Sequence, residues 1–255
     1  IMAMQWAENF GYKHADKVVS LLPKAKEYMQ LHGMSADKFS YISNGVAVND
    51  WLNSQQSMPD EHLKLFQELR EQGKFVLAYA GGMGDANALD YLLDACKLID
   101  PQVALLLVGD GPNKARLIER VQQENLQNVH FMPAIGKMQI PAFLNACDAL
   151  YIGWNNLPIY RFGICPNKLF DYMLAAKPII HSVSAGNDLV RDADCGYSVA
   201  AEDVSGIAAA INQVSQLAQL ERAELGARGK TYVLQQHDYA ILAQKFLASV
   251  FDTAK

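Results

Sequence analysis

Short, almost continuous apolar runs recur along this chain, and longer amphipathic segments separate them. Runs such as Phe75–Ala80 and Ala104–Val108 are apolar at successive positions rather than at every second one. This pattern is typical of strands that are buried on both faces, as in a parallel sheet covered by helices. The predicted strands are Lys17–Leu22, Phe39–Ile42, Phe75–Ala80, Ala104–Val108, Val129–Phe131, Ala149–Trp154, Pro178–Ser182 and Tyr197–Val199.

The segments between these runs carry apolar residues at helical spacing. Ala86–Ile99, for example, places Leu89, Leu92 and Leu93 on one stripe, and Asp85 precedes it as a candidate N-cap. Alternation of strands and helices with tight loops predicts an α/β fold, a doubly wound parallel sheet of the Rossmann-like kind. The predicted helices are Asp60–Gln72, Ala86–Ile99, Asn113–Glu124, Met138–Cys147, Asn167–Ala176, Val204–Leu220, Arg222–Gln235 and Tyr239–Val250.

Composition excludes several other classes of protein. Of the 255 residues 51% are hydrophobic, which is ample for a large core and argues against intrinsic disorder. No transmembrane helix or secretory signal peptide is predicted. The net charge of −5 gives no reason to expect a nucleic-acid partner. The cysteines form no CxxC pair or zinc spacing and are predicted to be buried free thiols: Cys96, Cys147, Cys165 and Cys195.

The first part of the chain is predicted to contain too few strands to form a complete sheet. Residues 1–45 are predicted to hold two helices and two strands, followed by a polar surface excursion over Asn49–Gly73. This first part is either a cap on the main domain or the tail of a preceding domain in a longer protein. Ile1 at the start, in place of Met, favours the second interpretation.

Ligands of an open parallel sheet bind beyond the carboxyl ends of its strands. After Phe75–Ala80 comes Gly81-Gly82-Met83-Gly84, a loop whose backbone N–H groups could approach a phosphate with a helix dipole behind them. Asn87 stands where a GxGxxG motif has its third glycine, so a tight turn without a ligand is the alternative.

Two further loops lie at the same predicted edge. Asp110 could hold a ribose, as in a dehydrogenase, but a turn in which this Asp caps the next helix is the favoured interpretation. The loop Met132–Gly136, with Pro133 and Ala134, could sandwich a flat base, and ordinary loop packing is equally compatible with it.

The segment Tyr160–Met173 combines an aromatic–glycine loop with a helix start that carries a cation. Lys168 and Asp171 are three residues apart and share a helix face. At an exposed first turn they could hold a diphosphate and a ribose, or they could form a surface ion pair.

Two other patterns favour structural roles. Asp192-Ala193-Asp194 matches the DxD metal–nucleotide signature, but it precedes Gly196 and is interpreted as a turn. His181 lies within an apolar strand and is predicted to be a hydrogen-bonded core residue. No Ser-His-Asp spacing is apparent.

Several motifs together resemble a known family. They are, in order, Asn44-Gly45-Val46, the loop Gly81–Gly84, Val108–Pro112, Asn128–Phe131, Asp148–Leu150 and Lys168–Ile180. This ordered set is similar to group 1 glycosyltransferases of the GT-B fold. Phe162-Gly163-Ile164 followed by Pro166-Asn167-Lys168 most resembles a bacterial branch that includes L-fucosaminyltransferases of surface-polysaccharide synthesis.

The resemblance implies a domain organisation. Residues 1–35 would be the tail of an N-terminal acceptor domain with the linker, residues 36–236 the nucleotide-sugar donor domain, and residues 237–255 a helix that crosses back. Without the rest of the acceptor domain, this part of the chain is expected to be inactive on its own.

The resemblance also implies the chemistry. It is transfer of a sugar, with retention, from a UDP- or GDP-sugar to a glycan or lipid-linked acceptor, without a cofactor or a metal. The location expected by default is the cytoplasm, and peripheral association of the intact protein with the inner face of the membrane stays open, because lipid-linked acceptors are common in the branch that the chain resembles.

The family's contacts can be carried over in part. Gly82 and Gly84 would approach the phosphates, and Asp171 matches the second acid of a paired-glutamate motif that holds the ribose. Gly163 stands where the first acid is expected, and Lys168 or Arg161 could replace positive charges that relatives carry near the glycine loop. The catalytic residues stay unassigned, and the expected donor-binding residues are Gly81, Gly82, Gly84, Pro133, Ala134, Arg161, Phe162, Gly163, Lys168, Leu169 and Asp171.

Two other functions compete with the transferase. Gly163 and Met83 favour a degenerate transferase that only binds nucleotide. The glycine loop and Asp110 favour a Rossmann oxidoreductase, although Asn87 and the lack of a second catalytic domain argue against it.

Overall fold

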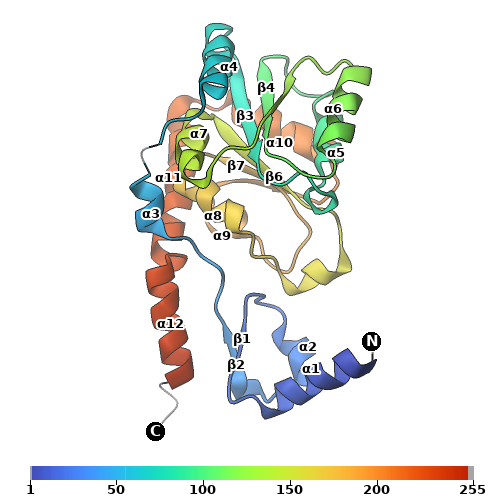
Figure 1. Ribbon diagram of the computed structural model, residues 1–255, viewed down its shortest axis with the longest axis vertical. Coiled ribbons are helices and arrows are strands. Elements are labelled where there is room, and N and C mark those ends of the chain that lie inside the picture. The colour runs from blue at the N-terminus through green and yellow to red at the C-terminus, as the bar shows by residue number, and fades with distance from the viewer. Residues whose placement is uncertain (1, 55, 252–255) are drawn as a thin grey trace.

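The computed structural model describes residues 2–54 and 56–251, so Ile1 and the end of the predicted last segment, residues 252–255, lie outside the described residues. Its centre is a six-stranded sheet whose neighbouring strands all pair in parallel, in the order β5-β4-β3-β6-β7-β8 (Figure 1). All six predicted strands of this region are confirmed within one residue or so at their ends. Their bounds are β3 Phe75–Ala80, β4 Val103–Val108, β5 Val129–Met132, β6 Ala149–Gly153, β7 Ile179–Ser182 and β8 Gly196–Val199.

Helices cover both faces of the sheet, which confirms the doubly wound α/β prediction. One apolar cluster joins the sheet to Leu92, Leu117 and Ile211, from α5 (Leu89–Ala95), α6 (Lys114–Gln123) and α10 (Val204–Gln216). The other cluster includes helices from across the opposite face. They are α3 (Val48–Leu52), α4 (Asp60–Glu71), α7 (Ile140–Ala146), α8 (Asn167–Leu174), α9 (Leu189–Asp192) and α11 (Gln219–Gln236).

The start of α5 differs from the prediction. Asp85 does not cap a helix over Ala86–Ile99; it opens the short 3₁₀ helix Asp85–Asn87 instead. Ala88 follows with φ of 51°, a left-handed conformation that interrupts the helical path, and α5 begins only at Leu89. The prediction was wrong because apolar spacing continues smoothly across a break that only the backbone angle at Ala88 reveals.

The first elements of the chain form what we call the N-terminal unit, residues 2–42. It contains α1 (Met2–His14), β1 (Val18–Ser20), α2 (Lys26–Leu31) and β2 (Phe39–Tyr41), with β1 and β2 paired in parallel. The two helices and two strands predicted there are confirmed. Figure 1 shows this unit in blue below the sheet domain, near the last helix α12 (Tyr239–Phe251).

The linker between the N-terminal unit and the sheet domain is held at the junction of α11 and α12. Val46 forms a parallel bridge with Asp238, and the Ser43 Oγ and His237 Nδ1 atoms are 2.8 Å apart in a buried contact. A Cβ on Gly45 would lie 2.2 Å from the His237 carbonyl oxygen, so only glycine fits there. This contact fixes where the chain enters the sheet domain.

Several smaller predictions have clear outcomes. Cys96, Cys147 and Cys195 are buried free thiols, whereas Cys165 is half-buried. His181 is fully buried with Nδ1 2.9 Å from Asp188, as predicted. The DxD sequence forms the end of α9 and a left-handed turn residue, Asp194 at φ of 47°, which confirms the turn. Within the described ranges, no helix has the length and apolar character needed to cross a membrane.

Candidate functional site

The glycine loop after β3 packs against the loop after β4. Gly81 N donates to Val108 O and Met83 N donates to Asp110 O, at 2.9 and 2.8 Å. Gly109 has φ of 143°, and a Cβ on it would lie 1.9 Å from the Gly81 carbonyl oxygen. The two loops therefore approach each other more closely than any side chain would permit.

This packing divides the amides of the glycine loop into two sets. Those of Gly81 and Met83 point inward and are bonded, whereas those of Gly82 and Gly84 have no hydrogen-bond partner among the described residues. The expected helix dipole directly behind the loop is not there, because the 3₁₀ helix Asp85–Asn87 intervenes before α5. The available donors at this loop are thus two backbone N–H groups rather than a helix start.

Lys168 lies against the same loop. Its Nζ donates to Tyr79 Oη and to Asn87 Oδ1, both at 2.8 Å, and Tyr79 Oη in turn donates to Gly82 O at 2.5 Å. The ammonium also lies 4.5 Å from the centre of the Tyr79 ring. Burial lowers the pKa of Lys168 to about 8. The lysine is thus partly buried rather than on the exposed turn that the sequence suggested.

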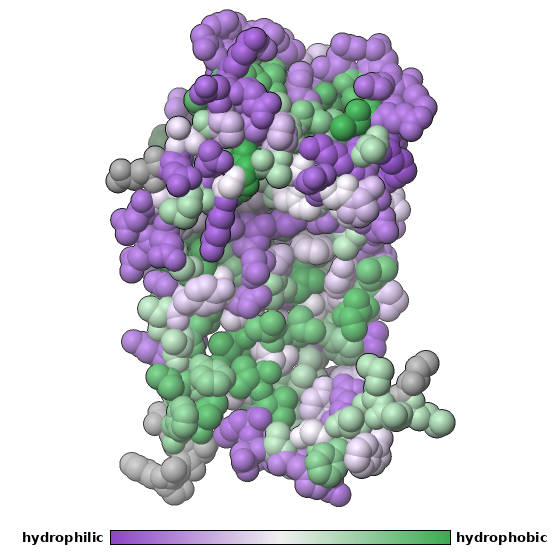
Figure 2. Space-filling view, viewed as in Figure 1, coloured by the Kyte–Doolittle hydropathy of each residue, from purple (hydrophilic) through white to green (hydrophobic). Residues whose placement is uncertain are grey.

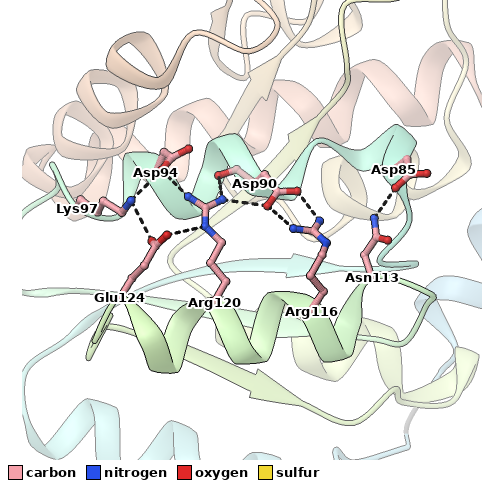
Figure 3. A network of polar contacts seen from close by, with 8 residues as sticks. All are labelled: Asp85, Asp90, Asp94, Lys97, Asn113, Arg116, Arg120 and Glu124. Carbon is pink, nitrogen blue, oxygen red and sulfur yellow. Dashed lines mark hydrogen bonds and ion pairs between the residues drawn. The ribbon is translucent and has the colours of Figure 1, made fainter.

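The helices that follow the two loops are joined by charged side chains (Figure 3). Arg120 of α6 contacts Asp90 and Asp94 of α5, and Arg116 pairs with Asp90 at 2.6 Å. Nearer the loops, Asn113 Nδ2 donates to Asp85 Oδ1 at 2.7 Å. Asp85 therefore ties the end of the glycine loop to α6 instead of capping α5.

Asp171 lies one helical turn after Lys168 but faces a different space. No ion pair between the two is present among the described residues, so the surface-pair alternative is wrong. Burial raises the pKa of Asp171 to about 6, while Lys137 acts in the opposite direction. Its cavity of about 270 Å³ is lined by Val46, Ala47, Asp50, Trp51, Asn53, Ser54, Lys137, Met138, Ile140, Pro141 and Asp171.

The loop after β5 carries Pro133 and Ala134, both exposed at the same edge of the sheet. The Pro133 carbonyl oxygen lies 3.1 Å from His62 Nε2, and His62 is itself buried on α4. A buried histidine from α4 thus holds this loop, and no pattern in the sequence predicts the contact.

Arg161, Phe162 and Gly163 lie elsewhere, in the segment that touches the N-terminal unit. Lys24 N donates to Phe162 O at 3.0 Å, and the rings of Phe162 and Tyr28 are 5.3 Å apart. Arg161 is exposed and stacks on Phe162 at 4.3 Å. Of the expected donor-binding residues, the structure brings Lys168 to the glycine loop and leaves Arg161 at this contact.

Gly163 has φ of 111°, and a Cβ there would lie 2.7 Å from Pro23 Cδ and 2.8 Å from Asn187 Oδ1. A side chain, and hence a first acid of the paired motif, does not fit at this position. Leu169, on α8, is fully buried in the core, so it supports the site from behind and does not line it.

Sequence reasoning missed several residues of the site. Tyr79 looked like one more apolar strand position, and Trp51 lies on α3, which was not predicted. The Trp51 Nε1 atom is buried without a partner among the described residues. Asn87 did carry a signal, since it replaces a motif glycine, but its role as a Lys168 acceptor depends on the fold.

The remaining polar patterns add no competing site. The Asp110 carboxylate accepts the Gly111 N–H at 2.8 Å, which agrees with a turn, although Asn113 rather than Asp110 precedes α6. Across residues 2–54 and 56–251, no three His, Cys, Asp or Glu side chains gather closely enough to hold a metal ion.

Comparison with known proteins decides the family. The sequence profile described as "Glycosyl transferases group 1" matches residues 74–216, more than half of the chain. The chain belongs to the group 1 glycosyltransferases. The match covers both glycine loops, Lys168 and Asp171, so the family's defining region is the sheet domain rather than the N-terminal unit.

Individual relatives agree with this membership. The chain is 25% identical over 185 residues to the putative colanic acid biosynthesis glycosyl transferase WcaI of Escherichia coli (strain K12). That match covers 69% of this chain and 40% of WcaI, so the chain spans less than half the length of this relative.

Solved structures share the fold. Anabaena Alr3699/HepE in complex with UDP-glucose has a TM-score of 0.77 at 20% identity, covering 98% of this chain and 68% of that one. Sucrose-phosphate synthase from Thermosynechococcus elongatus has a TM-score of 0.73 at 19% identity, covering 100% and 63%. The expected GT-B-type fold is thereby confirmed.

Proposed function

We propose that the sheet domain binds the nucleoside diphosphate of a sugar donor, UDP- or GDP-linked, across the carboxyl edge of its sheet. In the whole protein this sugar would pass, with retention, to a glycan or lipid-linked acceptor that a preceding domain holds. WcaI, named for colanic acid biosynthesis, and HepE, solved with UDP-glucose, support this proposal. The finer assignment to an L-fucosaminyltransferase-type branch rests on Phe162–Lys168 alone.

The observation that carries the proposal is the charge of Lys168. Its two hydrogen-bond acceptors, Tyr79 and Asn87, are neutral, and no carboxylate within the described part of the chain pairs with it. A partly buried ammonium without a counter-ion is costly, and a bound anion would remove that cost. Because this ammonium lies at Gly81, where the next free amides are those of Gly82 and Gly84, the anion that fits is a diphosphate.

The nucleoside would extend from the diphosphate along α8. Asp171, ionised above pH 6 or so, would accept the ribose hydroxyls, consistent with its place at the wall of the 270 Å³ cavity. Pro133 and Ala134, held by His62, would lie against the base. This arrangement gives each end of the nucleotide a different partner.

The proposed role of these residues in sugar transfer is to stabilise negative charge on the leaving group. As the bond from the sugar to the diphosphate breaks, negative charge develops on the leaving phosphate. Lys168 and the two free amides would stabilise that charge without reorganising, which is how fixed dipoles and cations lower a barrier. We propose no metal for this role, since the ammonium can supply the positive charge.

Calorimetric titration of the chain with UDP, GDP, ADP and NAD, with and without magnesium, tests the proposal. We expect metal-independent binding of one nucleoside diphosphate, weakened at least tenfold in Lys168→Met and unchanged in Lys64→Met, an exposed lysine on α4. Equal affinity of the Lys168→Met variant would remove the proposed role, and selective NAD binding would favour the oxidoreductase.

A second candidate is a nucleotide-binding module without transfer activity. The observation that favours it is the Gly163 backbone, which leaves no room for the first acid of the family's pair. Transfer by the whole protein, measured with a radiolabelled nucleotide sugar, separates the two: sugar-donor binding with no turnover would favour the module.

A further inference from the structure

A cavity at the opposite edge of the sheet has no part in the proposed donor site. Its volume is about 490 Å³, and it lies where the amino ends of β6 and β7 meet the start of α11. It is lined by Arg70, Asn145, Ala146, Asp148, Ala176, Lys177, Pro178, Gln219, Arg222 and Ala223. Polar groups dominate this lining, and three of its ten residues are cations.

The cations of this cavity outnumber its acids. Arg70 pairs with Asp148 at 2.7 Å, and the same Asp148 oxygen also accepts the Val76 N–H at 2.7 Å. One carboxylate thus stands against three cations in the lining, and it pairs directly with Arg70, which leaves the cavity with a net positive charge. Glu221 does not line the cavity, because its carboxylate accepts the Ala218 N–H at 2.7 Å.

Lys177 is the informative residue. It is half-buried, and its Nζ has neither a hydrogen-bond nor an ion-pair partner in the described part of the chain. Burial lowers the pKa of Lys177; Cys147 and Asp148 act in the opposite direction, and Arg70 and Arg222 add to the lowering. Arg222 is held in place by the Leu217 carbonyl and by stacking 5.3 Å from the Phe75 ring. Two cations thus line one cavity, and neither forms an ion pair with a carboxylate in the described part of the chain.

We propose that this cavity, the amino-edge pocket, binds the phosphate of a small phosphorylated molecule, with Lys177 and Arg222 as its two ligands. The charge matches, because a phosphate monoester carries about −1.5 to −2 at neutral pH. The volume also exceeds that of a single phosphate and falls in the range of small-molecule sites, about 300–1,000 Å³. Bound there, the ligand would join the turn before β7 to the first turn of α11.

The test uses inorganic phosphate as the probe, at constant ionic strength set with chloride. Phosphate is titrated into the ¹⁵N-labelled chain in the presence of saturating UDP, which removes the donor site from competition. We expect the amides of Ala176, Lys177 and residues 219–223 to shift along one saturable curve. Lys177→Gln and Arg222→Gln should each raise the dissociation constant at least fivefold.

Two control variants complete the design. Lys230→Gln, on α11 but outside the pocket, and Lys64→Gln, at an exposed position of α4, should both leave the curve unchanged. Shifts that do not saturate, that chloride reproduces, or that persist unchanged in Lys177→Gln and Arg222→Gln would overturn the proposal. The reporting amides lie at the opposite edge of the sheet from Lys168, so their shifts can be read even if UDP does not bind, and the two proposals can fail separately.

Discussion

The sheet domain and the N-terminal unit use apolar residues in opposite ways. In the sheet, Leu77 and Leu105 are fully buried between two layers of helices. In the N-terminal unit, α1 has no buried residue, and Met2, Trp6 and Phe10 are 88%, 69% and 51% exposed along one stripe. Figure 2 shows hydrophobic side chains gathered over the lower part of the molecule, where α12 and this unit lie. Regular helices therefore form in both regions, but only one of them encloses a core.

The largest expected difference comes from removing a large side chain in each region. Leu105→Ala should lower the free energy of unfolding by about 2–5 kcal/mol, because a cavity replaces tightly packed atoms. Trp6→Ala, on the exposed stripe of α1, should change it by less than about 0.5 kcal/mol. Urea unfolding followed by circular dichroism measures both, and a Trp6→Ala loss as large as that of Leu105→Ala would contradict the comparison.

Glycines give a second contrast. Gly109→Ala should cost about 2–3 kcal/mol, since its φ of 143° is strained for alanine and the new Cβ meets the Gly81 carbonyl. Nucleotide affinity should fall with it, because the two loops would move apart. Gly11 lies inside α1 with nothing within 4 Å, so Gly11→Ala should stabilise that helix by about 0.5–1 kcal/mol. Thermal unfolding and UDP titration of both variants test the opposite signs.

These contrasts also explain how much the sequence could reveal. The strands were predictable because a run such as Ala104–Val108 is buried on both faces and is therefore apolar throughout. The site was predictable only in part. Lys168 could be placed near the glycine loop from its position at a helix start, but its acceptors Tyr79 and Asn87 come together only in the folded sheet.

Backbone geometry accounts for most of the errors. The left-handed Ala88 breaks a helix that side-chain spacing alone extends, and nothing in a lone alanine announces it. The short helices α3 and α9 are only five and four residues long, too short for a helical period to show. The domain boundaries at residues 35 and 236 stay predictions. The parallel bridge between Val46 and Asp238 shows where the linker meets the sheet domain.

The pH dependence of nucleotide binding should come from titrating groups of the sheet domain and not from those of the N-terminal unit. Only the protonated form of Lys168 attracts a diphosphate, and its pKa in the free protein is about 8. Affinity should therefore be highest between about pH 6, above which Asp171 is ionised, and pH 8, and it should fall by up to about tenfold per pH unit above pH 8. Lys168→Arg keeps its charge and should abolish this alkaline decline. Calorimetry at pH 7 and 9 checks it, and an alkaline decline that persists in Lys168→Arg would assign the titration to another group.

The smallest expected changes in stability come from removing a charged side chain in each region. Arg120 joins Asp90, Asp94 and Glu124 between α5 and α6. In the N-terminal unit the half-buried Lys38 donates to the Lys13 carbonyl at 3.0 Å and has no ion pair among the described residues. Arg120→Ala should cost about 1 kcal/mol, because such networks are partly screened by solvent. Lys38→Ala should be neutral within about 0.5 kcal/mol.

Salt concentration and pH should both change the stability effect of Arg120→Ala. Half-molar salt should shrink the Arg120→Ala cost, because screening weakens the pairs that the variant lacks. Hydrogen bonds from Arg116 and Arg120 hold the pKa of Asp90 in the folded protein below its usual value. Ionised Asp90 therefore stabilises the fold at pH values above its pKa in the unfolded chain, and this stabilisation is lost as the pH falls through its pKa in the folded protein. The wild type should therefore lose more stability on acidification than Arg120→Ala does. Urea unfolding at pH 7 and 3.5 measures it, and parallel losses in the two proteins would place the acid sensitivity outside this network.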